Sequence, residues 1–136
     1  MAAKDIKVQI LNDGYRNTTV KISGYVNADD YTNESIVDAA TLTQIDAQGS
    51  KAKSLRVTRI NYDIEDALQV DLIWGGGTPA TLWNATGRGE MEGRDFGGIT
   101  NNATTPNQTI LLTTTGGGVA TTNLSFSIIL EIVKAS

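Results

Sequence analysis

Three carboxylates fall within four consecutive positions, at Asp63, Glu65 and Asp66. Neighbouring carboxylates are the groups with which glycosidases cleave sugars and with which many proteins hold Ca²⁺. Asp63 and Glu65 are two apart, so on a β-strand they would share one face. No acidic ligand array of the EF-hand type surrounds them. We interpret the cluster as part of a solvated loop, with a Ca²⁺ site and a catalytic pair as the alternatives.

Histidine and cysteine are both absent from the chain. Their absence removes the commonest general base, the usual serine-triad partner, the thiolate nucleophile and two common metal ligands. The Gly87–Gly89 segment resembles a fragment of a phosphate loop, but neither a helix start nor a Lys-Ser/Thr pair follows it. The sequence therefore predicts a protein that is not an enzyme, with no catalytic residues, no cofactor and no metal ion.

Two aromatic residues, Trp83 and Phe96, are the candidates for contact with a ligand or a partner. Trp83 lies near a loop, and an exposed aromatic ring offers a flat apolar surface on which a sugar can stack. Phe96 is an isolated apolar residue in the glycine-rich segment Thr86–Gln108. Trp74, in contrast, closes an apolar alternation and is predicted to lie in the core. A carbohydrate-binding module is therefore one alternative function.

Length and charge narrow the class of protein further. A chain of 136 residues suggests a single domain, residues 1–136. The net charge of −4 gives no advantage in neutralising phosphates, so we expect no nucleic-acid partner. The N-terminus lacks the apolar core of a signal peptide, and no stretch approaches the roughly 20 apolar residues of a membrane span. We expect synthesis in the cytoplasm and no membrane partner.

The C-terminal segment Thr122–Lys134 organises the predicted fold. Its apolar residues recur at a spacing of two, which is the period of a β-strand. They are Leu124, Phe126, Ile128, Leu130 and Ile132. The opposite face begins with Asn123 and Ser125 and becomes partly apolar at Ile129 and Val133. We therefore expect the second half of this strand to be covered on both sides.

The N-terminal third predicts a hairpin and one short helix. Ile6–Ile10 and Val20–Val26 alternate apolar and polar residues, and the Asn12–Gly14 turn between them is a hairpin signal. Further along, Ile36, Val37, Ala40 and Leu42 could share a helical face with Asn33 as its cap, which suggests a short helix or a single turn. Asp46–Lys53 is predicted to be a surface loop.

The remaining segments add further short strands. Leu55–Ile64 changes phase, which predicts a β-bulge near Thr58–Arg59. Leu68–Trp74 should end at Gly75–Pro79, and Thr86–Gln108 should be irregular. The other elements expected are strands at Ala80–Ala85 and Thr109–Thr115 and a turn at Gly116–Gly118. This pattern predicts an all-β, antiparallel β-sandwich or jelly-roll-like fold with at most one short helix.

Three groups of segments carry a resemblance to a known class of protein. They are Leu55–Ile64 with Val70–Trp74, Gly87–Gly89 with Phe96–Asn101, and Ile110–Gly116 with Phe126–Lys134. In this order they resemble small virion structural proteins of tailed bacteriophages, particularly marine and cyanobacterial ones. The likeness covers Asp46–Lys134.

The resemblance implies a β-sandwich that is made in the host cytoplasm and assembles on the virion. Members of this kind decorate or cement the capsid, or belong to the neck or tail. The implied partners are the major capsid protein, other virion proteins and further copies of the chain, and a trimer would suit a capsid three-fold position. Met1–Asp5 or the Thr86–Gln108 loop are the segments that we expect to dock on a neighbouring subunit.

Overall fold

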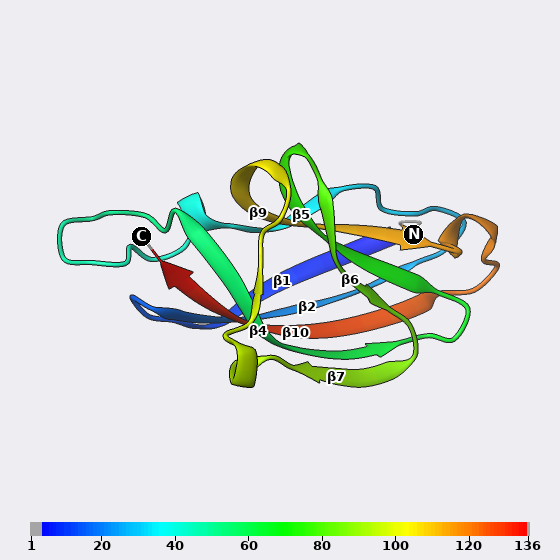
Figure 1. The fold of residues 1–136 in the computed structure, drawn as a ribbon. Helices are drawn as coiled ribbons and strands as arrows, with labels where there is room; N and C mark the ends of the chain where they lie inside the picture. Colours follow the sequence, from blue (N-terminus) through cyan, green and yellow to red (C-terminus); the bar gives the residue numbers. More distant parts are fainter. Residues whose placement is uncertain (1–3, 136) are drawn as a thin grey trace.

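A computed structural model describes residues 4–135 as two packed antiparallel β-sheets (Figure 1). In sheet A the strands lie in the order β1 (Lys4–Asp13), β2 (Asn17–Val26), β10 (Leu124–Ala135), β4 (Ser54–Ile64) and β7 (Arg88–Glu92), and the short β8 (Ile99–Thr100) also pairs with β4. In sheet B the order is β3 (Glu34–Asp38), β9 (Thr104–Thr115), β5 (Gln69–Thr78) and β6 (Ala80–Ala85). Within the described range, the helical elements are three short 3-10 turns: η1 (Ala39–Thr41), η2 (Arg94–Phe96) and η3 (Gly117–Val119).

The strand order is that of a jelly roll. Without β1 and β8, each sheet has four strands, in the orders β2-β10-β4-β7 and β3-β9-β5-β6. Successive strands of this set alternate between the sheets, except for β5 and β6, which form a hairpin within sheet B. This connectivity defines a double-sheet jelly roll. The predicted all-β sandwich is therefore confirmed, and β1 is an additional strand at one edge of sheet A.

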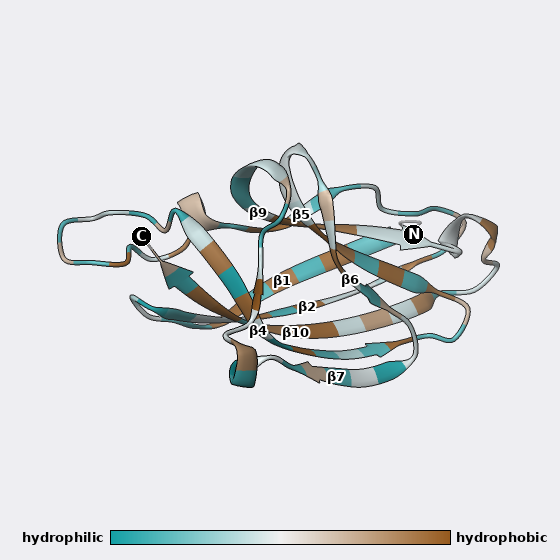
Figure 2. Cartoon of the chain, viewed as in Figure 1, coloured by the Kyte–Doolittle hydropathy of each residue, from teal (hydrophilic) through white to brown (hydrophobic). Residues whose placement is uncertain are grey.

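The C-terminal strand β10 lies in the middle of sheet A, between β2 and β4. Its even-numbered residues from Phe126 to Ile132 are buried, as the spacing of two predicted, and Figure 2 shows brown and paler bands alternating along this strand. On the other face Ser125 and Ser127 are exposed, whereas Ile129 and Val133 are half-buried. The second half of β10 is thus partly covered on both sides.

Two further predictions about sheet A are confirmed. β1 and β2 form the expected hairpin, in which Gly14 N–H donates to the carbonyl of Asn17 at 2.9 Å. The β-bulge in β4 also exists, because Arg59 pairs with Glu131 and Val57 pairs with Ile132, which leaves Thr58 as the extra residue. The bulge lets residues on either side of Thr58 keep their apolar side chains in the core although the phase of the sequence changes.

Of the short helix or single turn predicted at residues 33–42, only the single turn exists, as η1, and the residues before it form the strand β3. Ser35 pairs with Leu111 and Val37 with Ile110, so Ile36 is a bulge residue and both Ile36 and Val37 are buried. Two adjacent apolar residues on one side resemble a helical face in the sequence, but a bulge achieves the same burial in a strand. Asp38, not Asn33, caps the turn.

Two glycine-rich segments are more regular than predicted. β5 ends at Thr78, inside the predicted Gly75–Pro79 segment, but its glycines Gly75–Gly77 still belong to the strand. A Cβ at Gly75 would overlap the side chains of Thr109 and Asn107, so glycine here permits the close approach of β9. The segment Thr86–Gln108 contains β7, η2, β8 and the start of β9, so it is not irregular, and its docking on a neighbouring subunit stays a prediction. Of the other expected docking segment, Met1–Ala3 lie outside the described residues.

The two ends of the sandwich are built differently. In Figure 1 the β2–β3, β4–β5, β6–β7 and β9–β10 connections gather at the right, whereas the β1–β2 turn, the β3–β4 loop and the C-terminus lie at the left. At the left end Lys134 is fully buried, and its Nζ donates to Asp13 Oδ1 at 2.7 Å and to the Thr43 carbonyl at 2.9 Å. These contacts join the hairpin, β10 and the β3–β4 loop. In the described part of the chain there is no helix with the length and apolarity needed to cross a membrane.

Candidate functional site

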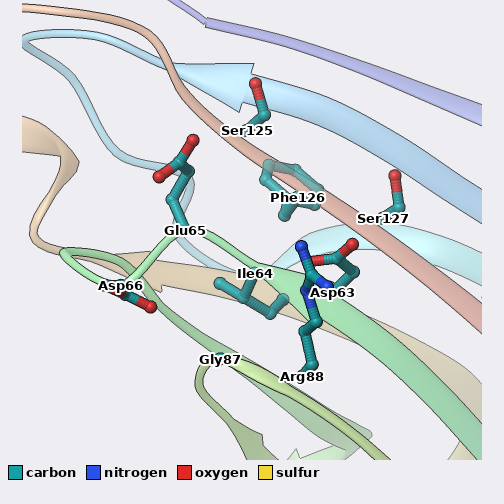
Figure 3. A pocket seen from close by; sticks show the side chains of 9 residues that line it. All are labelled: Asp63, Ile64, Glu65, Asp66, Gly87, Arg88, Ser125, Phe126 and Ser127. Atoms are coloured by element: carbon teal, nitrogen blue, oxygen red, sulfur yellow. The ribbon is translucent and has the colours of Figure 1, made fainter.

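An open cavity of about 610 Å³ lies at the right-hand end of the sandwich (Figure 3). It is formed where the β4–β5 turn and the β6–β7 turn meet the start of β10. Its lining residues are Asp63, Ile64, Glu65, Asp66, Gly87, Arg88, Ser125, Phe126 and Ser127. The acidic cluster and the Gly87 turn that the sequence analysis considered therefore lie side by side.

The carboxylates in this cavity do not converge. Arg88 Nε donates to Asp63 Oδ1 at 3.2 Å, and both side chains are largely exposed. Glu65 lies after the end of β4 and not on a strand face with Asp63, and Figure 3 shows the carboxylates of Glu65 and Asp66 apart from each other and from that of Asp63. Within residues 4–135, no three acidic, histidine or cysteine side chains are grouped so that they could hold a metal ion. The cluster is a solvated set of charges.

Glu65 and Asp66 are presented on a well-defined turn. Leu68 N–H donates to the Glu65 carbonyl at 3.0 Å, and Glu65 N–H donates to the Ser125 carbonyl at 3.1 Å. Both acidic side chains are exposed, and neither makes an ion pair with another residue of the range 4–135. The turn thus projects two adjacent uncompensated negative charges from the right-hand end.

A second cavity, of about 480 Å³, lies at the opposite end of β4. Its lining residues are Lys53, Ser54, Leu55, Arg56, Thr100, Asn101, Pro106, Gln108 and Ala135. Lys53 is exposed and Arg56 is half-buried, and neither makes an ion pair with another described residue. We call this cavity the basic cleft. No local pattern in the sequence indicates this cleft, because Lys53 and Arg56 become neighbours of Thr100 and Gln108 only when β8 and β9 are in place.

The aromatic residues singled out in the sequence have different surroundings. Trp74 is fully buried in sheet B, as predicted. Trp83 packs half-buried against the core, and its Nε1 is buried without an acceptor in the described structure. Phe96, in η2, is 65% exposed. Trp83 lines none of the cavities described above, and its role in binding a ligand stays a prediction, as does that of Phe96.

The edge strand β1 is the most apolar exposed feature. Six large apolar or aromatic side chains among residues 4–135 are exposed, and four of them belong to β1 and the turn that follows it. These four, which we call the β1 patch, are Val8, Ile10, Leu11 and Tyr15. Among residues 4–135, β1 pairs only with β2, so the hydrogen-bonding groups along its other edge have no partner strand there.

The outer face of sheet A carries a network of charges that fixes its side chains. Arg59 donates to Glu131 at 2.8 Å and also bonds Glu90, while Arg94 reaches Glu131 at 3.0 Å. The hydrogen bond from Arg59 and the charge of Arg94 hold the pKa of Glu131 below its ordinary value, although burial opposes this shift. The charges of this network are therefore compensated, unlike those of the basic cleft.

No protein-family model, curated protein or solved structure matches this chain. The class of the protein, a jelly-roll β-sandwich, is defined by the order of its strands. What it does must be argued from its surfaces.

Proposed function

We propose that this protein is a non-enzymatic structural protein of a tailed-phage virion that decorates or cements the capsid. The resemblance described in the sequence analysis motivates this proposal. The jelly roll is in keeping with it, since this fold occurs in viral capsid domains as well as in lectins. A fold alone does not define a function, so the function has to be inferred from the exposed residues of the protein.

The observation that carries the proposal is the β1 patch. Val8, Ile10 and Leu11 are between 44% and 48% exposed on a ten-residue strand with an open edge. Such an edge invites association with another chain unless it is protected, and clustered apolar side chains mark protein contact sites. In this proposal, the capsid shell protein covers the β1 patch.

The proposed mechanism is multivalent docking. Each copy would bury a modest patch that gives weak binding by itself. Copies held at symmetric positions on one shell then act together, because linked contacts raise the effective concentration of each. A trimer around a capsid three-fold axis is one arrangement that meets this requirement.

The test is co-sedimentation of the purified protein with capsids of the phage that encodes it. Leu11→Asp places a charge on the β1 patch at the residue that bulges between Ile10 and Asn12. We expect this change to weaken capsid binding at least about tenfold, which corresponds to about 1.4 kcal/mol. Val119→Asp is the matched control, because Val119 is 88% exposed in η3, far along the chain from β1. It should bind as the wild type does.

Electron microscopy with a labelled antibody against the protein would locate it on the virion. Label on the shell supports decoration or cementing. Label confined to the neck or tail would replace this proposal by the neck or tail role. Failure to bind any part of the particle, with the protein shown to be folded by circular dichroism, would refute the proposal.

A further inference from the structure

Two uncompensated sets of charge lie at opposite ends of a single strand. β4 begins at Ser54, beside Lys53 and Arg56 in the basic cleft, and ends at Ile64, next to the Glu65–Asp66 turn. The ten steps between its eleven residues separate the two ends by about 33 Å at about 3.3 Å per residue. The cations are thus too far from the carboxylates to pair with them in the same molecule.

The basic cleft has the size and the lining of a binding site. Its volume of about 480 Å³ lies in the range of ligand sites. Apolar parts of Pro106 and Ala135 line it together with the two cations, and among residues 4–135 no acidic residue lines it. Its β9 wall contains Gln108 at φ 58°, with Thr105 at φ 51° close by, and such strained backbone persists only where surrounding structure holds it. The cleft is therefore preformed.

The Glu65–Asp66 turn has the complementary properties. It is a tight turn fixed by the two backbone hydrogen bonds of Glu65, and its two carboxylates are exposed. The turn thus offers two negative charges on a short, ordered projection, and the cleft offers two positive charges in a recess. Little conformational entropy is lost when a preformed projection enters a preformed recess.

We propose that the basic cleft of one copy receives the Glu65–Asp66 turn of a second copy. Lys53 and Arg56 then pair with the two carboxylates, and the apolar wall of the cleft excludes water from the contact. The same two surfaces remain free at the far ends of the pair. The contact is heterologous, so it generates a closed ring if the rotation between copies closes and an open chain if it does not.

This contact is between copies and uses neither the β1 patch nor a capsid. Its test therefore needs only the purified full chain, and its failure would leave the capsid proposal standing. Sedimentation velocity over a concentration series that reaches about 1 mM would detect even a weak association. We expect the wild type to associate, and to do so less in high salt, because exposed charge pairs are screened.

Charge reversal supplies the decisive experiment. Lys53→Glu/Arg56→Glu makes the cleft acidic, and Glu65→Lys/Asp66→Lys makes the turn basic. Each variant alone then presents like charges to itself, and we expect its association to weaken at least about tenfold. An equimolar mixture of the two variants restores opposite charges at both kinds of contact and should associate again.

Arg16→Glu/Lys21→Glu is the matched control. It changes the net charge by as much as the cleft variant does, but its two exposed positions lie in the β1–β2 hairpin. It should associate as the wild type does. Three results would each overturn the proposal: a wild type that stays monomeric throughout the series, folded variants that associate as strongly as the wild type, or a mixture that remains monomeric. Circular dichroism of every variant checks that each is folded.

Discussion

The contact between Lys134 and Asp13 supports the sharpest stability prediction. The Lys134 side chain is 0% exposed and that of Asp13 is 15% exposed. Asp13 also accepts hydrogen bonds from Thr18 Oγ1 at 2.9 Å and from Thr43 N–H at 2.8 Å. One carboxylate thus gathers donors from β2, β10 and the β3–β4 loop. Replacing Lys134 by Met would leave this carboxylate without its only charged partner among residues 4–135.

The magnitude follows from the burial of the pair. Removing one partner of a buried ion pair costs about 3–5 kcal/mol, because the other charge remains without compensation. That is a large share of the roughly 5–15 kcal/mol by which a domain is stable. An unfolding entropy of about 2.1 cal/mol/K per residue over 136 residues gives about 0.29 kcal/mol/K. Lys134→Met should therefore lower Tm by about 10–17 °C.

The assay is urea unfolding followed by tryptophan fluorescence, which reports on the core through the fully buried Trp74. Asp13→Asn alone should also destabilise the protein, because Lys134 then lacks its counterion. In the double variant no unpaired charge remains and the amide can still accept hydrogen bonds. We expect the double variant to be more stable than the sum of the single changes by about 2 kcal/mol.

The matched control is Lys21→Met on the neighbouring strand, because Lys21 is exposed. This change should alter stability by no more than about 0.5 kcal/mol. The reasoning would be refuted if Lys134→Met cost less than about 1 kcal/mol, or if the two single effects were additive within about 0.5 kcal/mol.

Three further outcomes follow from the structure. Burial raises the pKa of Asp13, but hydrogen bonds from Lys134, Thr43 and Thr18 outweigh it and hold this pKa below its ordinary value. The unfolded chain therefore takes up the proton first, and the wild type should lose stability relative to Asp13→Asn as the pH falls below about 4 in acid titrations. A Cβ at Gly24 would overlap the Asp5 carbonyl, whereas a Cβ at Gly14 would come no closer than 3.9 Å to a neighbouring atom. Gly24→Ala should therefore lower the free energy of unfolding, measured with urea, by about 1–3 kcal/mol. Gly14→Ala should not lower it by this amount. Trp74→Phe should lower the free energy of unfolding by less than about 1.5 kcal/mol, because removing the unpaired Nε1–H offsets part of the lost packing. A decrease of more than about 3 kcal/mol would contradict this account.

Sequence patterns predicted those elements whose side chains obey one period throughout. In β10 the even-numbered residues from Phe126 to Ile132 are buried, and in β2 Val20, Ile22 and Val26 are buried. The bulge in β4 was also predictable, because Thr58 shifts the phase of a long alternation and leaves enough residues on each side to show the shift. β3 has only five residues, so its bulge at Ile36 removed the alternation altogether and produced the pattern of a helical face.

The glycines of β5 illustrate a second reason for failure. Gly75–Gly77 resembles a terminator when only neighbours in sequence are considered. The reason for glycine at Gly75 lies about thirty residues away, where the side chains of Asn107 and Thr109 occupy the space of a Cβ. The basic cleft was unpredictable for the same cause, because Arg56 meets Gln108 through the pairing of β8 and the path of β9. Interactions between distant segments carry no local signal.

The β1 patch shows how a surface can share the pattern of a core. Ile6, Val8 and Ile10 alternate as regularly as Val20 and Ile22, and the pairing of Val8 with Ile22 and of Ile10 with Val20 puts each pair on the same face of sheet A. Val20 and Ile22 are buried, whereas Val8 and Ile10 are nearly half exposed. The difference arises because β1 extends sheet A beyond the four strands that sheet B can cover, and the strand at that edge of sheet B is the short β3. Whether sheet B covers a strand of sheet A therefore depends on the topology of the whole domain. The surface that we propose to meet the capsid follows from the unequal widths of the two sheets.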